Sequence, residues 1–181
     1  MDVFIEQIVE RKPLFHDRLL KTLLLLAMAS LTAALLFAGI AFLSMPFISF
    51  SALAAVPGAI WLGIHFLKGL TVEYEYILTN KELDIDKIIG KRKRKRMFTF
   101  DLNNAEKLDI CEEGGEFSAD VTVSAHDNSY TNMWYLIIKH DSHGRVLLLF
   151  NPNDAFAVKL NNALPHRIRN SKIPQNVKEQ K

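Results

Sequence analysis

The chain of 181 residues contains one cysteine, Cys111, and lacks the short motifs that mark common classes of enzyme. A single cysteine excludes an intrachain disulfide and a metal site built from cysteines. The sequence has no glycine-rich phosphate loop, no nucleophile elbow and no zinc-binding helix motif. The formal net charge of +2 is too small to indicate a class of partner. We therefore expect a protein that is not an enzyme and has no cofactor, no metal site and no small-molecule substrate.

Charge is absent from the stretch between Thr22 and Leu67, which contains no Asp, Glu, Lys or Arg. A helix of about 20 apolar residues crosses a bilayer, and this stretch supplies two such segments, 22–43 and 47–67. Helices are favoured over strands because each helix satisfies its own backbone hydrogen bonds in lipid. The short break between the segments allows only an antiparallel connection, and Pro46 suits the first turn of the second helix. The sequence predicts a transmembrane helical hairpin over residues 22–67.

Small residues recur at a spacing of four in both predicted spans. This spacing gives each helix a flat stripe that allows close approach of two backbones. The stripes are expected to pack within the hairpin or to mediate association between copies, although alanine is also simply common in membrane helices. They consist of Ser30, Ala34 and Ala38 in the first span and Ala55, Ala59 and Gly63 in the second.

Basic residues flank the predicted hairpin, whereas its connecting turn carries no charge. Lys68 follows the second span, and the bases before the first span are Arg11, Lys12, Arg18 and Lys21. The positive-inside rule therefore places both termini in the cytoplasm. We expect an integral protein of the cytoplasmic membrane.

Residues 1–21 form a cytoplasmic segment before the hairpin. They are not a cleaved signal peptide, because acidic residues are mixed with the basic ones. The apolar side chains of Val3, Phe4, Ile8 and Val9 favour a short amphipathic helix over residues 2–10. We expect this helix to lie at the membrane surface, with docking on the soluble domain as the alternative.

After Lys68 the hydrophobic pattern changes from helical to alternating, which is typical of half-buried strands. Residues 68–166 are expected to form a cytoplasmic domain, followed by a flexible tail at 167–181. Asn151 as cap and Pro152 as first residue predict a final helix that Pro165 stops. Strands are expected at 72–79, 83–89, 98–102, 107–111, 121–125, 133–139 and 145–150, with a loop at 112–116.

A run of six or seven antiparallel strands closed by one helix is the order of a pleckstrin-homology-like (PH-like) barrel. The segment from Tyr76 to Leu83 and the turn at Gly90 resemble bacterial membrane proteins with PH-like domains, most strongly over residues 72–101. The whole chain resembles an uncharacterised bacterial family of small two-helix membrane proteins, a domain of unknown function. This resemblance implies an α+β membrane protein in which an N-terminal transmembrane hairpin precedes a PH-like antiparallel β-barrel or sandwich closed by a C-terminal helix. It implies an architecture and no activity.

Six consecutive basic residues after Gly90 are the strongest candidate for a binding site: Lys91, Arg92, Lys93, Arg94, Lys95 and Arg96. A basic cluster of this size beside a membrane helix is typical of binding to anionic lipid. The alternative is a solvated or internally paired hairpin tip, because acidic residues lie nearby in the sequence. Nucleic acid is disfavoured, since no aromatic side chains are interleaved with the run as stacking platforms.

Two functions are compatible with these features. The first is a membrane-anchored binding module whose basic tip contacts anionic lipid head groups, without catalysis. The second is an interaction or assembly subunit that docks on other membrane proteins, or on a second copy, through the barrel edge or the final helix. An exposed aromatic cluster at Tyr130, Trp134 and Tyr135 would favour the second.

Two further groups of polar residues are expected to be solvated. His126, His140 and His143 lack a spacing that defines a metal site. Asp84 and Asp86 alternate along a strand, a pattern typical of solvent-facing charge.

Overall fold

The computed structural model describes residues 3–111, 117–129, 131–171 and 173. The chain divides into two compact units. The helical unit comprises Pro13–Thr71 and Ile89–Lys91, and the β unit comprises the residues before and after them, including Val72–Ile88. The expected loop at 112–116 and most of the expected tail lie outside the described residues.

The helical unit is a hairpin of α1 (Phe15–Ala41) and α2 (Pro46–Gly69). Both helices are long and apolar enough to cross a membrane. Only 6% and 11% of their most apolar windows are buried, so they differ from the core helices of a soluble protein. α1 begins at Phe15, several residues before the predicted start of the first span at residue 22. Pro46 lies in the first turn of α2, as predicted.

Small side chains allow α1 and α2 to approach closely. The Ser49 hydroxyl donates a hydrogen bond of 2.6 Å to the carbonyl oxygen of Gly39, and both residues are buried. A Cβ atom added at Gly39 would lie 2.7 Å from the Leu53 side chain, and one at Gly63 would lie 2.1 Å from the sulfur of Met28. Close backbone packing therefore holds the hairpin together.

The β unit contains two four-stranded sheets. The first has the order β1-β2-β3-β4, formed by Phe4–Glu10, Val72–Thr79, Glu82–Ile89 and Lys93–Asp101. The second has the order β5-β7-β8-β6, formed by Ala105–Ile110, Trp134–His140, Gly144–Phe150 and Val121–Ala125. β6 pairs with β8 in parallel, whereas the other described pairs are antiparallel. The parallel pair departs from the all-antiparallel order expected from the sequence, because Ala125 at the end of β6 and Trp134 at the start of β7 both lie opposite Phe150 at the end of β8.

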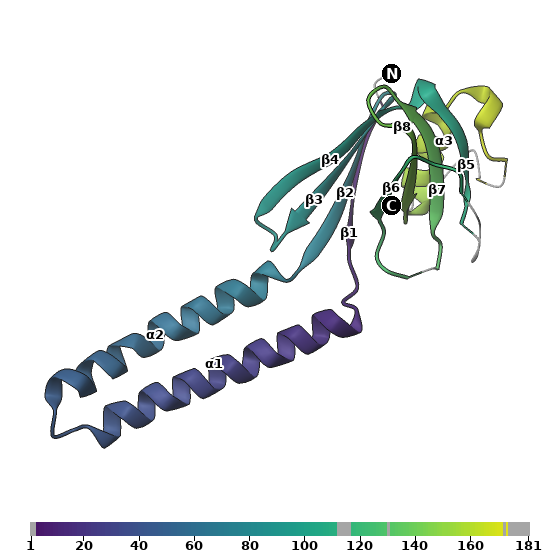
Figure 1. Ribbon diagram of the computed structural model, residues 1–181. Coiled ribbons are helices and arrows are strands. Elements are labelled where there is room, and N and C mark those ends of the chain that lie inside the picture. Colours follow the sequence, from purple (N-terminus) through teal and green to yellow (C-terminus); the bar gives the residue numbers. More distant parts are fainter. Residues whose placement is uncertain (1–2, 112–116, 130, 172, 174–181) are drawn as a thin grey trace. The chain divides into compact units, whose positions relative to one another are not determined.

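The segment predicted to be an amphipathic helix is instead β1. It pairs antiparallel with β2 over its whole length, from Phe4 opposite Thr79 to Glu10 opposite Glu73. Alternating burial accompanies this pairing, since Ile5 and Val9 pack against the core while Phe4 and Ile8 are exposed. The prediction of a helix is therefore wrong, and the segment belongs to the β unit. The hairpin α1–α2 is an insertion between two paired strands (Figure 1).

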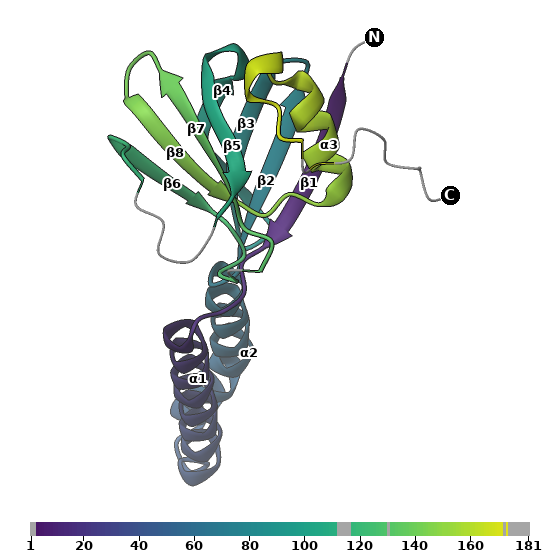
Figure 2. The same ribbon diagram turned by 90° about the vertical axis from the view of Figure 1, so that its right-hand side faces the viewer.

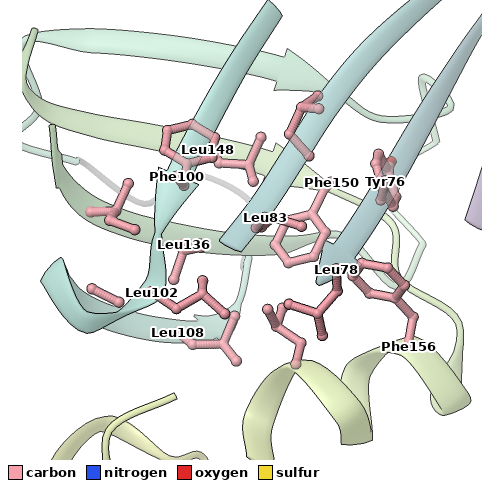
Figure 3. Close-up of a cluster of buried hydrophobic side chains, with 14 of the residues drawn as sticks. Tyr76, Leu78, Leu83, Phe100, Leu102, Leu108, Leu136, Leu148, Phe150 and Phe156 are labelled. Atoms are coloured by element: carbon pink, nitrogen blue, oxygen red, sulfur yellow. The ribbon is translucent and has the colours of Figure 1, made fainter. Parts of the chain in front are cut away.

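One hydrophobic core lies between the two sheets and is closed by α3 (Asp154–Ala163), as Figures 2 and 3 show. Tyr76 from β2 makes edge contacts with Phe150 and Phe156, each at a centroid distance of 5.8 Å. Each large apolar side chain buried in this way contributes about 1.5–3 kcal/mol. The two sheets and the closing helix give the α+β, PH-like build that the sequence predicts.

α3 packs against β1 and begins later than predicted. Its N-cap is Asn153, whose side-chain oxygen accepts a hydrogen bond from the Phe156 amide at 2.8 Å. Asn151 is not the cap, since its side chain instead accepts from the Asp127 amide and donates to the Thr131 carbonyl. The cap therefore lies two residues after the predicted one, because Asn151 is engaged by Asp127 and Thr131.

Candidate lipid-binding surface

The basic run begins in the tight turn between β3 and β4, and this turn is fixed by glycine. Gly90 and Lys91 both have positive φ, 63° and 57°, a conformation that glycine adopts without a steric penalty. A Cβ atom at Gly90 would lie 2.9 Å from the carbonyl oxygen of Lys68. The Gly90 amide donates a 2.8 Å hydrogen bond to the carbonyl of Thr71. The turn that starts the basic run is therefore held against the C-terminal end of α2.

The rest of the run forms the first half of β4, at one edge of the first sheet. All six basic residues, Lys91–Arg96, are exposed. An edge strand leaves one side open to solvent, which allows consecutive charged residues to be tolerated there. The run therefore forms a turn and part of an edge strand, where consecutive charged side chains can remain exposed to solvent.

Two arginines of the run pair with carboxylates of the same sheet. Arg94 donates to the Glu75 carboxylate at 2.8 Å. Arg96 contacts Asp86 at 2.9 Å and Asp84 at 3.0 Å. Its hydrogen bond with Asp86 raises the pKa of Arg96. These two arginines therefore neutralise acidic residues of β2 and β3.

The carboxylates beneath them are poorly accessible to solvent. Glu75 is 0% exposed, and its Oε2 atom has no hydrogen-bond partner among the described residues. Burial raises the pKa of Glu75, the neighbouring Glu6 raises it further, and the charge of Arg94 lowers it. Asp86 is buried and Asp84 is half-buried, which contradicts the expectation that both face solvent. The alternating pattern places Asp84 and Asp86 on one face of β3. It does not show that the Arg96 side chain from β4 contacts both carboxylates.

The lysines of β4 behave differently from its arginines. Lys93 and Lys95 are exposed and make no ion pair among the described residues. Lys91 and Arg92 are exposed in the turn before them. We call Lys91, Arg92, Lys93 and Lys95 the basic quartet. Arg94 and Arg96 thus pair with carboxylates of the sheet, and all four residues of the basic quartet are exposed.

The residues of the two predicted stripes occupy different environments. Gly63 is buried between α1 and α2, and Ala38 and Ala59 are half-buried. Ser30, Ala34 and Ala55 are exposed within the hairpin. The contact face of α1 also includes Met28, which the small-residue pattern did not single out, because a flexible thioether fills the space over a glycine.

The remaining candidates do not gather into a site with the basic run. The Nδ1 atom of half-buried His126 accepts from the Asn128 amide at 3.0 Å, and burial lowers the pKa of His126. Tyr135 is buried and packs on Phe117 at 4.6 Å between ring centroids, and Trp134 is half-buried. Tyr130, the third member of the aromatic cluster, lies outside the described residues. Among the described residues, no three His, Cys, Asp or Glu side chains are grouped so that they could hold a metal ion together.

The chain resembles known proteins at the level of a protein family. A family model described as a bacterial PH-like domain (DUF6106) matches residues 1–170. No curated protein matches the chain, and no solved structure matches it. The matched residues include β1, the apolar hairpin and both sheets. The chain therefore belongs to the DUF6106 family of bacterial PH-like domains.

Proposed function

We propose that this protein is a membrane-anchored binding module, in which the basic quartet contacts anionic lipid head groups at the cytoplasmic leaflet. The single observation that carries the proposal is the hydrogen bond from Gly90 to Thr71, which ties the turn of the quartet to the end of α2. If α2 crosses the bilayer, Lys68 marks its exit, because lysines at helix ends extend to the head groups. The quartet then begins at head-group level.

The energy available limits what the quartet can do. Each basic residue near an anionic surface contributes about 1 kcal/mol, whereas insertion of a helical hairpin is effectively irreversible. The quartet is therefore not needed for recruitment. Its role is to orient the β unit on the leaflet and to concentrate anionic lipid beneath it, a binding role without catalysis.

Both chain termini lie in the cytoplasm in this proposal. Arg11 and Lys12 precede α1, Arg18 and Lys21 lie near its start, and Lys68 lies in the last turn of α2, whereas the turn between the helices carries no charge. β1 and β2 pair directly, so the chain segments entering and leaving the hairpin lie on the same side of the membrane.

The test uses the full chain, because a fragment starting after α2 would lack β1. The protein is reconstituted in nanodiscs of mixed neutral and anionic lipid, and the lipid that stays bound after mild detergent extraction is quantified by mass spectrometry. The variant Arg92→Ser, Lys93→Ser, Lys95→Ser is compared with a matched control, Lys139→Ser, Lys159→Ser, Arg167→Ser, which removes the same charge from exposed sites elsewhere. We expect anionic lipid to be enriched with wild type and control, and enrichment to be lost in the first variant and at high salt. Equal enrichment in both variants would refute the proposal.

The second candidate function is an interaction subunit, and one observation favours it. Phe4 and Ile8 on β1 are 60% and 52% exposed and lie on an edge strand of the first sheet. An apolar contact at this edge would be insensitive to salt, in contrast to head-group binding. Cross-linking of the full chain in native membranes, with Phe4→Ser as the comparison, tests this candidate.

A further inference from the structure

The two histidines at the β7–β8 turn have a geometry that the sequence did not indicate. His140 ends β7, and His143 precedes Gly144, the first residue of β8. The Nδ1 atoms of His140 and His143 face each other at 3.3 Å. The Ser142 hydroxyl lies 3.2 Å from each of these nitrogens. Three potential donor atoms for a cation therefore converge on one small volume.

The distance between the two nitrogens fits a tetrahedral metal. Zinc–nitrogen bonds of about 2.0–2.1 Å at a tetrahedral angle place two nitrogens about 3.3–3.4 Å apart. A square-planar metal with similar bonds requires about 2.9 Å. The spacing of His140 and His143 thus matches the first geometry and is too wide for the second.

The imidazole rings are held in place by their neighbours. The ring of Phe98 makes edge contacts with both, at centroid distances of 5.8 Å to His140 and 5.2 Å to His143. The His143 amide donates to the His140 carbonyl at 3.3 Å and closes the turn. A pair of ligands that is already oriented loses less conformational freedom on binding.

The hydrogen bonds made by the two Nδ1 atoms are long, at 3.2–3.3 Å. The Ser142 amide lies 3.2 Å from His140 Nδ1 and can donate to it, a long bond that uses the single lone pair of that nitrogen. The contact between the two Nδ1 atoms is itself a long hydrogen bond when one of the two rings carries its proton on Nδ1. A divalent metal replaces the long amide contact with two coordinate bonds.

We propose that His140 and His143 form a two-histidine binding site for a divalent transition metal that prefers tetrahedral coordination, of which zinc is the representative. The two Nδ1 atoms supply two ligands, and water completes the coordination. This site is separate from the basic quartet and does not depend on the proposed lipid function.

The test uses the full chain in detergent, without a polyhistidine tag. Zinc binding is measured by titration calorimetry, and cobalt(II) serves as a spectroscopic probe because its visible bands distinguish tetrahedral from octahedral coordination. The variants His140→Gln and His143→Gln are compared with His166→Gln, which removes an exposed histidine from a different element. Circular dichroism verifies that all variants fold.

We expect one zinc ion per chain, with binding weakened about 100-fold or more in either turn variant, because two linked ligands bind far more tightly than one. His166→Gln should bind as wild type, and the cobalt spectrum should be tetrahedral. Equal affinity in wild type and in the double variant His140→Gln, His143→Gln would overturn the proposal. An octahedral cobalt spectrum that neither turn variant changes would overturn it as well.

Discussion

Replacing Arg94 by glutamine removes the cation that faces a fully buried carboxylate. The Arg94 side chain is 59% exposed, and that of Glu75 is 0% exposed. Breaking a fully buried ion pair by removing one partner costs about 3–5 kcal/mol. Solvent screens the exposed arginine, so a smaller loss of about 1–2 kcal/mol in the free energy of unfolding is expected.

The loss depends on pH in a defined direction. Burial raises the pKa of Glu75 above 4.5, so the folded protein holds this proton more tightly than the unfolded chain does. The stability contributed by Glu75 is therefore complete below pH 4.5 and is lost as pH rises through the raised pKa. Arg94 lowers that pKa, and Arg94→Gln shifts it further upward. The variant should be most destabilised at neutral pH and should approach wild type on acidification.

Urea unfolding of the full chain in micelles measures the effect, followed by fluorescence in a Trp61→Phe background. Trp134 then reports on the β unit alone. The neutral variant Glu75→Gln provides the control, because it removes the buried charge that Arg94 compensates. When Glu75→Gln is already present, Arg94→Gln should lower the free energy of unfolding by less, and this loss should no longer depend on pH. The reasoning is refuted if Arg94→Gln costs the same with Glu75 and with glutamine at that position.

Three further substitutions test the fold. Tyr76→Phe removes a buried hydroxyl that donates to the Ala125 carbonyl, and it should lower the free energy of unfolding by about 1–2 kcal/mol; an unchanged urea midpoint would contradict this. Asn153→Ala removes the cap of α3 and should cost about 1 kcal/mol by the same assay, with recovery expected for a serine at that position. Gly63→Leu places a side chain where Met28 lies, and it should separate the helices; disulfide trapping between cysteines introduced across α1 and α2 should fall, and undiminished trapping would argue against close packing.

The hairpin and the later strands could be predicted because their signals are local. An uncharged stretch of two span lengths leaves few alternatives to helices, and alternating residues such as those from Val72 to Thr79 specify a strand without knowledge of its partner. The prediction for the N-terminal segment was wrong because its apolar residues fit the period of a helix as well as that of a strand. Val3, Phe4, Ile8 and Val9 lie on one side of a helix, yet the pairing of β1 with β2 decides the outcome. That partner begins more than sixty residues later, after the inserted hairpin.

The sequence located the basic run, but it could not tell which of the basic residues pair with carboxylates of the sheet. Six adjacent bases have no local feature that separates Arg94 and Arg96 from their neighbours. The separation depends on carboxylates from β2 and β3, and on the edge position of β4. The histidine pair also escaped prediction, since the turn conformation fixes the distance between His140 and His143.

The most direct test of the account places a probe on the basic quartet. Lys93→Cys in a Cys111→Ser background is labelled with a fluorophore, and the full chain is reconstituted in nanodiscs that contain head-group-quenched lipid. A label at Lys159, an exposed residue of α3, is the control. The account predicts strong quenching at position 93 in anionic nanodiscs, weaker quenching in neutral ones or at high salt, and little quenching at position 159. Equal quenching at the two positions, whatever the lipid charge, would contradict it.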